Sequence, residues 1–247
     1  MSSLTLTVLG CDGSHPGPGG AGSGYLVRDW SLGTALWLDA GPGTFATLQQ
    51  FTDPMGLRGI VLSHEHADHW FDLEAVVTAA RWTMDFHGEP IPVLAAPGIR
   101  ERLAQDIDGV LDWREIGDGD SAEMGGLHLR FSRTDHPPVT LGVRIESPGG
   151  GVLGYSADSG PGWALESLGT GLDLALCEAT FTKDHEAEHQ IHMSGRQAGR
   201  AARQARARRL VITHRWATIA APAVLAEAAD SFGGRVDAAA VGTGFSL

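Results

Sequence analysis

Residues 62–70 read LSHEHADHW and follow the apolar run GIVL at residues 59–62. A short apolar run bounded by polar residues predicts a buried β-strand. Four potential metal ligands then fall within six residues, in the loop where that strand ends: His64, His66, Asp68 and His69. Neutral imidazole and carboxylate groups are ligands that zinc and other divalent first-row metals accept. The stretch therefore predicts a metal site at the end of a strand.

A polar surface turn is the alternative interpretation of this stretch. Three imidazoles held close together repel one another when protonated, and they have no evident packing role in a turn. The metal site is therefore the favoured hypothesis.

One loop cannot supply enough ligands for two metal sites, so further ligands are expected at other strand ends. His136 follows the predicted strand at residues 127–133, Asp158 follows another in GYSADSG, and His214 ends the run RLVITH. A lone histidine after a strand is more often incidental, but three such residues at three strand ends support one another. Glu178 in LCEAT and His192 in IHMSG are interpreted as a proton-transfer pair.

The rest of the chain alternates between strands broken by glycine and amphipathic segments. Strands are expected at residues 4–9, 25–30, 35–38, 59–62, 92–95, 127–133, 140–146, 152–155, 172–177, 209–212 and 236–240. Helices are expected at residues 44–51, 71–85, 99–106, 194–206 and 222–230. The pattern predicts an α/β fold with sheets stacked between helices. A length of 247 residues is compatible with a single domain over residues 1–247.

A second stretch, GPGGAG at residues 17–22, spells the dinucleotide-binding pattern GxGxxG, and Asp39 follows it at the end of an apolar run. That fingerprint requires a helix to open at its third glycine. Here the strand-like run SGYLVRDW follows instead, so a dinucleotide site is not expected. The glycines would allow the backbone to approach a substrate. Ser14 and His15 are candidate phosphate contacts, with a plain tight loop as the alternative.

Composition restricts the partners and the cellular location. The formal net charge of -12 argues against binding along an extended nucleic acid, although a small anionic substrate held by metals remains compatible. The two cysteines, Cys11 and Cys177, are too few for a disulfide scaffold or a cysteine-rich zinc site, and are expected to be reduced thiols. The first residues lack a basic, apolar leader pattern, and no apolar run of 18 residues follows. A soluble cytoplasmic protein without a membrane partner is expected.

HEHADH, His136, YSADSG and VITH, in this order and spacing, resemble the metallo-β-lactamase superfamily, whose pattern is HxHxDH, a later His, a bridging Asp and a final His. The resemblance implies an αββα sandwich of two mixed β-sheets flanked by helices, with the site on the rim where the sheets meet. It also implies two divalent metal ions, zinc first, with manganese or iron as alternatives. Its ligand sets, carried onto this sequence, are His64, His66 and His136 for the first metal and Asp68, His69 and His214 for the second, with Asp158 bridging.

CEATF and HMSG look like the branch of that superfamily that contains the tRNA 3′-processing endoribonuclease (ribonuclease Z) and phosphodiesterases of small cyclic phosphates. The N-terminal stretch LGCDGSHPGPGGAGSGYLV adds a resemblance to actinobacterial cyclic-nucleotide phosphodiesterases. The tRNA enzyme carries a long tRNA-gripping arm between its third-histidine region and its bridging aspartate. Only 21 residues separate His136 from Asp158 here, which, with the acidic charge, disfavours tRNA processing.

The expected function is hydrolysis of small phosphodiesters, cyclic nucleotides above all, through a metal-bridging hydroxide that attacks phosphorus in line. Asp68 would orient or deprotonate the attacking water. His192, positioned by Glu178, would donate a hydrogen bond to the phosphate or a proton to the leaving alkoxide. Trp163 and Trp216, close after the bridging aspartate and the final histidine, are candidates for stacking a nucleobase, with core or rim packing as the alternative.

Two other functions stay open. The same scaffold can direct hydroxide at a carbonyl group, as in a lactonase or thioesterase. A non-catalytic metal-binding or nucleotide-sensing protein would be marked by a missing ligand, and none is missing. Relatives of the resembling family make a homodimer a candidate assembly.

Overall fold

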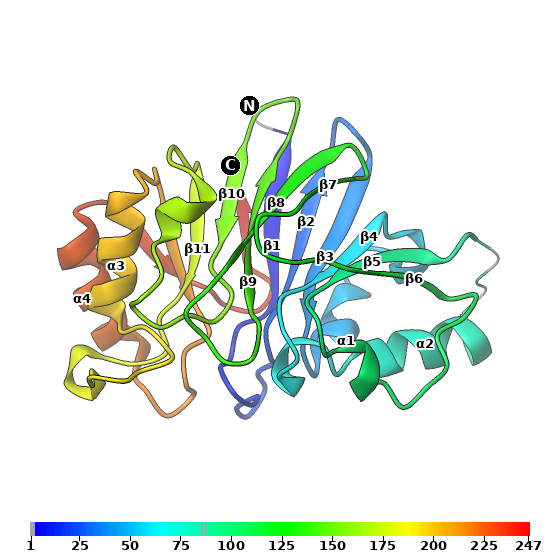
Figure 1. Ribbon diagram of the computed structural model, residues 1–247, viewed down its shortest axis with the longest axis horizontal. Coiled ribbons are helices and arrows are strands. Elements are labelled where there is room, and N and C mark those ends of the chain that lie inside the picture. The colour runs from blue at the N-terminus through cyan, green and yellow to red at the C-terminus, as the bar shows by residue number, and fades with distance from the viewer. Residues whose placement is uncertain (1–2, 85, 87) are drawn as a thin grey trace.

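The computed structural model describes residues 3–84, 86 and 88–247, and in this part of the chain two seven-stranded sheets lie face to face. Helices cover the outer sides of the sheets, with α1 and α2 beside the first sheet and α3 and α4 beside the second (Figure 1). The strand order is β14-β1-β2-β3-β4-β5-β6 in the first sheet and β13-β12-β11-β10-β9-β8-β7 in the second. The expected α/β fold of two mixed sheets flanked by helices is confirmed.

The bounds of the elements are as follows. The first sheet contains β1 (Leu4–Gly10), β2 (Gly24–Asp29), β3 (Thr34–Ala40), β4 (Gly59–Leu62), β5 (Ile91–Ala95), β6 (Leu111–Glu115) and β14 (Gly244–Ser246). The second contains β7 (Ser121–Met124), β8 (Leu127–Arg133), β9 (Leu141–Glu146), β10 (Val152–Tyr155), β11 (Leu174–Glu178), β12 (Leu210–Thr213) and β13 (Val236–Ala238). The α-helices are α1 (Thr44–Leu48), α2 (Leu73–Trp82), α3 (Gly195–Gln204) and α4 (Ala221–Phe232). Short 3₁₀ turns lie at η1 (Pro54–Gly56), η2 (Ala67–His69), η3 (Arg100–Arg102), η4 (Leu165–Leu168) and η5 (Lys183–His185). Over the described residues, none of the helices is long and apolar enough to cross a membrane.

Each sheet is antiparallel in one half and parallel in the other. Strands β3 to β6 pair in parallel in the first sheet, and β10 to β13 do so in the second. A parallel strand is buried on both faces, so both of its side-chain rows are apolar. In β11, Leu174 and Leu176 pack in the cluster between the sheets, whereas Ala175 and Cys177 pack with α3 and α4.

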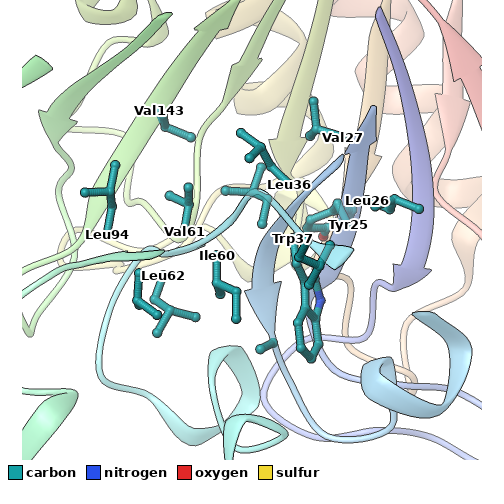
Figure 2. Close-up of a cluster of buried hydrophobic side chains, with 14 of the residues drawn as sticks. Tyr25, Leu26, Val27, Leu36, Trp37, Ile60, Val61, Leu62, Leu94 and Val143 are labelled. Atoms are coloured by element: carbon teal, nitrogen blue, oxygen red, sulfur yellow. The ribbon is translucent and has the colours of Figure 1, made fainter. Parts of the chain in front are cut away.

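The main core fills the space between the sheets. In Figure 2, Val61 of β4 and Val143 of β9 lie on the same side of β4, and Ile60 and Leu62 lie on the other side. All four side chains are buried. Because side chains alternate along a strand, one four-residue run covers two apolar layers, which explains why GIVL is continuously apolar.

The expected helix at residues 99–106 is wrong. Only η3 is helical there, and Leu103 already has an extended backbone. The reason is tertiary: the Ala104 amide donates to Glu74 Oε1 of α2 at 2.7 Å instead of forming an intrahelical bond. The Gln105 side-chain amide donates to the Glu74 carbonyl at 2.7 Å.

Other differences concern the ends of elements and the edges of sheets. Helix α1 ends at Leu48, earlier than expected. Helix α2 runs from Leu73 to Trp82 and is also shorter than expected. Asp85, the expected end of that helix, lies outside the described residues. Three short strands were not anticipated, and each lies at a sheet edge: β6, β7 and β14. Edge strands carry polar, exposed side chains, which hide the apolar signal of a strand.

Candidate metal centre

The ends of five strands bring the candidate residues to one rim of the sandwich. His64 follows β4, His136 follows β8, Asp158 follows β10, Glu178 ends β11 and His214 follows β12. The loops after β1 (blue) and β12 (orange) lie along the lower edge of the molecule in Figure 1. Residues from both sheets therefore meet where the sheets meet, as the resemblance implied.

The first group of converging side chains consists of three histidines and one aspartate. His64 Nε2 lies 3.1 Å from His66 Nδ1, which in turn lies 3.2 Å from His136 Nε2. Asp158 Oδ2 lies 3.6 Å from His64 Nε2. One ligand atom from each of the four residues lies within 4.8 Å of the others. Nitrogen atoms that face one another in this way fit a shared cation better than a chain of hydrogen bonds.

The second group consists of Asp68, His69 and His214 and touches the same aspartate. His214 Nε2 lies 3.3 Å from Asp68 Oδ2 and 3.3 Å from Asp158 Oδ2. His69 Nε2 lies 3.3 Å from Asp158 Oδ1. The carboxylate of Asp158 therefore stands between the two groups.

Two buried atoms test whether a metal fits. Over the described residues, His69 Nε2 and Asp158 Oδ1 face each other at 3.3 Å, but neither atom makes a hydrogen bond. A buried polar atom without a partner costs about 1–3 kcal/mol, so such atoms are rare unless an ion or water completes them. A divalent cation between the two atoms would complete both. The donor set of imidazole and carboxylate groups fits a divalent metal site.

The electrostatic environment prepares the imidazoles as ligands. Burial lowers the pKa of His64 well below its ordinary value, and the neighbouring His69 lowers it further. Burial also lowers the pKa of His66 and of His136. These three rings are therefore neutral near pH 7 and have lone pairs to donate.

The carboxylates of the cluster carry the opposite charge. Burial raises the pKa of Asp68 and of Asp158, but the histidines around them lower it more, so both pKa values lie below the ordinary one. Burial lowers the pKa of His69, whereas Asp158, Asp68 and Asp39 raise it more strongly, and the net pKa is well above the ordinary value. These carboxylates thus favour a positive charge between them, and a metal cation would supply that charge.

Hydrogen bonds from behind the cluster turn the ligand atoms inward. His69 Nδ1 donates to Asp39 Oδ2 at 2.7 Å, and the Tyr155 hydroxyl donates to the same oxygen at 2.7 Å. His136 Nδ1 donates to the Ile191 carbonyl at 2.9 Å. Such second bonds fix the ring and its tautomer, which leaves Nε2 for the metal.

Asp39 holds a histidine of the cluster, a role that the sequence analysis does not give it. In the sequence, Asp39 stands out only as the acid of a dinucleotide pattern that the following strand excludes. Its available signal was an acidic side chain at the end of a fully buried strand, β3. A buried carboxylate requires hydrogen-bond donors, and Ser63 supplies two more through its amide at 2.7 Å and its hydroxyl at 2.8 Å.

Glu178 and His192 lie together, as the interpretation of a proton-transfer pair requires. His192 Nδ1 donates to Glu178 Oε1 at 2.9 Å. The buried Glu178 carboxylate also accepts bonds from the Ser159 amide at 2.7 Å, the Thr180 hydroxyl at 2.9 Å and the Met193 amide at 3.0 Å. Four donors hold this carboxylate in one orientation, so the His192 ring is held with it.

His192 borders both ligand groups. Its ring centroid lies 4.9 Å from that of His136 and 5.2 Å from that of His214. Burial lowers the pKa of His192, but the adjacent Glu178 carboxylate raises it more, to about 9. About 12% of the side chain is exposed. The ring is therefore protonated at neutral pH, and its Nδ1 is occupied by Glu178.

The candidate substrate contacts divide into two kinds. Ser14 and Trp216 lie beside the cluster: the Ser14 amide donates to Asp68 Oδ2 at 2.8 Å, and the Trp216 Nε1–H donates to Ser14 Oγ at 3.1 Å. His15 is exposed, and its Nδ1 lies 3.2 Å from the Pro16 carbonyl of its own loop. Trp163 is buried and donates to Ser132 Oγ at 3.2 Å, so the alternative of core packing applies to it.

Glycines on two segments, one of them in the glycine-rich loop, lie against the backbone of Asp68, a candidate metal ligand. A Cβ atom at Gly22 would lie 2.7 Å from the Asp68 carbonyl oxygen, and one at Gly41 would lie 2.0 Å from it. The Ser23 amide donates to that carbonyl at 3.0 Å. Glycine is thus required for close approach to the loop that carries Asp68. Strand β2, not a helix, follows residues 17–22, as expected.

Comparison with known proteins agrees with this arrangement. The model of the beta-lactamase superfamily domain matches residues 34–215. An uncharacterized protein of Mycobacterium leprae is 34% identical over 254 aligned positions, which cover 99% of this chain and 89% of that protein. Ribonuclease Z of Mycobacterium bovis is 29% identical over 244 positions, which cover 85% of each chain. The crystal structure of the metallo-beta-lactamase fold protein YhfI from Bacillus subtilis superposes with a TM-score of 0.88 at 25% identity, covering 98% of this chain and 99% of that one. The chain therefore belongs to the beta-lactamase superfamily, in its ribonuclease Z-like branch, and is a metal-dependent hydrolase.

Proposed function

We propose that this chain is a dinuclear phosphodiesterase of small phosphodiesters, with cyclic nucleotides as its principal substrates. The observation that carries the proposal is the position of Asp158, whose carboxylate lies 3.6 Å from His64 Nε2 in one ligand group and 3.3 Å from His214 Nε2 in the other. One carboxylate shared by two groups of ligands is suited to two neighbouring ions.

The residues that would hold the ions fall into two sets around that carboxylate. They are His64, His66 and His136 for one ion and Asp68, His69 and His214 for the other, with Asp158 common to both. Two divalent ions in these positions supply Lewis acidity, which activates water at neutral pH and stabilises negative charge on the phosphoryl oxygens. Zinc, manganese and iron all suit imidazole and carboxylate ligands.

The protein's own groups complete the chemistry. Asp68 is held by the Ser14 amide, and its depressed pKa keeps it ionised, so it can accept a hydrogen bond from the attacking water and orient it. His192 uses Nδ1 to bond Glu178, so its other ring nitrogen, Nε2, carries the hydrogen directed at substrate. That hydrogen can bond a phosphate oxygen or protonate the leaving alkoxide as the ester bond breaks.

The Glu178–His192 pair favours a phosphodiester substrate through resemblance, because CEATF and HMSG, which carry these residues, look like the phosphate-cleaving branch of the superfamily. Hydrolysis of a phosphodiester expels an alkoxide, and His192 can supply the proton that this leaving group takes up. The similarity to ribonuclease Z, an enzyme that acts on RNA, supports the same choice. The net charge of -12 and the short segment between His136 and Asp158 favour small substrates over tRNA.

A substrate panel with metal analysis tests the proposal. The protein, loaded with zinc, manganese or iron, is assayed on cAMP, cGMP, an aryl phosphodiester, a lactone and a thioester, and the metal content is measured on the same samples. We expect two metal ions per chain and turnover of the phosphodiesters. Turnover of the lactone or thioester without any phosphodiester turnover would contradict the proposal.

The bridging role of Asp158 has its own test. The Asp158→Ala variant should lose metal occupancy and turnover together, because both ligand groups lose the same carboxylate. Mass spectrometry under native conditions measures the metal content. A variant that keeps two ions and full activity would refute the shared site.

A further inference from the structure

An exposed tryptophan stands at the edge of the cluster. Trp216 follows His214 by two residues, and 37% of its surface is exposed. Its backbone amide donates to the Thr180 carbonyl at 3.2 Å, which anchors it to the segment after β11. The indole packs edge-on against Phe181, with ring centroids 6.0 Å apart and an interplanar angle of 63°. The buried Phe181 thus contacts the indole, and more than a third of the surface of Trp216 stays exposed.

Ser14 ties this indole to the metal-ligand cluster. The indole N–H donates to Ser14 Oγ at 3.1 Å, and the Ser14 amide donates to Asp68 Oδ2 at 2.8 Å. Ser14 has a φ of 64°, a backbone conformation that is uncommon for a residue other than glycine. Two hydrogen bonds through one residue therefore fix the position of the indole relative to a candidate ligand.

The two segments are also joined through their backbones. The Gly13 amide donates to the Arg215 carbonyl at 3.1 Å. A Cβ atom at Gly13 would lie 2.6 Å from the His214 carbonyl oxygen, so the segments touch directly. The loop after β1 and the segment that carries His214 are therefore packed together beside the cluster. Such packing preorganises a binding surface.

We propose that Trp216, supported by Phe181 and positioned by Ser14, is a stacking subsite for the planar base of a nucleoside phosphodiester. The inference rests on the proposed phosphodiesterase function and assigns its specificity. The phosphate enters the cluster, and the base, a few bonds away, stacks on the exposed part of the indole. Trp163, the other candidate for stacking, is buried, and the exposed Trp30 ring lies under the Arg28 guanidinium at 4.5 Å.

Substrates with and without a base test the subsite. The zinc-loaded Trp216→Ala and Trp216→Phe variants are compared with the wild type on cAMP and on the ribose 3′,5′-cyclic phosphate that lacks a base. Base–aromatic stacking predicts that KM for cAMP rises about tenfold or more in Trp216→Ala and by less in Trp216→Phe. KM for the abasic substrate stays unchanged. The control is Trp82→Ala, which removes an exposed tryptophan at the end of α2 and should leave KM unchanged for both substrates.

Ser14→Ala tests the positioning role. This variant keeps the backbone bond to Asp68 and removes only the hydroxyl that accepts from the indole. We expect KM for cAMP to rise by a smaller factor than in Trp216→Ala, with the metal content unchanged. An equal rise in KM for both substrates in Trp216→Ala, or an unchanged KM for cAMP, would overturn the subsite. A Ser14→Ala variant that retains the wild-type KM for cAMP would overturn the positioning role.

A binding measurement separates failure of the subsite from failure of the proposed function. Calorimetry gives the affinity of the metal-loaded wild type and of Trp216→Ala for AMP and for ribose 5-phosphate. If no cyclic phosphate is hydrolysed, the phosphodiesterase proposal fails and this binding decides the subsite alone. Tighter binding of AMP that is lost in Trp216→Ala supports stacking, whereas equal affinity for the two ligands in the wild type overturns it.

Discussion

At the scale of the residue, the cluster depends on groups that do not face it. His69 relies on Asp39, His136 on the Ile191 carbonyl, and His192 on Glu178. Each of these partners binds Nδ1 and so decides which ring nitrogen is directed inward. A metal site with the right ligands but without these partners would have free rotation of its rings.

The Asp39→Asn variant should weaken metal binding at the group of Asp68, His69 and His214. The amide cannot accept from His69 and Tyr155 as the carboxylate does, so we expect metal affinity to fall about 10- to 100-fold. Competition with a chromophoric chelator measures the change. Tyr155→Phe is the matched control, because it removes one donor to the same carboxylate and keeps its charge, and its effect should be smaller. Two sites of wild-type affinity in Asp39→Asn would contradict this dependence.

The His192→Ala variant should lose turnover and keep its metals. Removal of a general acid lowers kcat about 10²- to 10⁴-fold, whereas the proposed ligands are untouched. Steady-state kinetics and metal analysis on one preparation check both parts. His128→Ala, an exposed histidine beside Glu123 on the second sheet, should match the wild type. Loss of metal from His192→Ala would show that this residue is a ligand rather than a proton donor.

At the scale of the element, the packing of helix α3 determines the position of His192, which lies just before the helix. Helix α3 starts at Gly195, with a capping box in which the Ser194 hydroxyl accepts from the Gln197 amide at 3.2 Å. The helix lies against α4 through glycine: a Cβ atom at Gly199 would lie 2.4 Å from the Ala228 carbonyl oxygen. Close packing of the two helices thus holds the segment that carries His192.

The Gly199→Ala variant should be destabilised, although alanine favours helices. The gain in helix propensity is about 1 kcal/mol, and the clash with α4 costs about 1–3 kcal/mol for an overpacked position, more where backbone is the neighbour. We expect a lower free energy of unfolding in urea. Arg203→Ala, on the exposed side of the same helix, should change stability by less than about 0.5 kcal/mol. A Gly199→Ala variant more stable than the wild type would show that α3 and α4 can separate freely.

At the scale of the whole molecule, Asp29 joins the two sheets. It ends β2 in the first sheet and accepts a hydrogen bond from Ser147, which follows β9 in the second sheet. Ser31 and Ser3 donate to the same carboxylate at 2.7 Å and 3.0 Å. Burial raises the pKa of Asp29, but these bonds and the Leu32 amide lower it more, to about 2.

This link should make stability depend on pH. Because folding depresses the pKa of Asp29, its contribution is complete above the unfolded pKa of about 4 and is lost as the pH falls through about 2. The Asp29→Asn variant should therefore be less stable than the wild type by about 2 kcal/mol at pH 7, with a smaller gap at pH 3 and below. Urea denaturation across this range measures the gap, and Ser147→Ala should reproduce part of it. A gap of the same size at pH 7 and pH 2 would contradict the assignment.

The fold was predictable wherever local pattern and burial coincide. Strands β4, β8 and β10 have the expected bounds because each is an apolar or alternating run between turn residues. The error at residues 99–106 has the opposite origin, since Glu74 of α2 takes the amide that a helix would have used. The edge strands β6, β7 and β14 were missed because an edge needs little apolar surface.

The class of fold, the family and the set of candidate ligands could be predicted from the amino-acid pattern alone, because those residues stand in short motifs at strand ends and their spacing along the chain is characteristic. How the ligands are held, and what lies beside them, depends on contacts that form only in the folded chain. Asp39 reaches His69 across 30 positions, Ile191 reaches His136 across 55, and Ser14 reaches Trp216 across 202. Hydrogen bonds between such distant segments leave no periodic signal in the sequence, because they form only when the two sheets have packed and their loops meet at one rim.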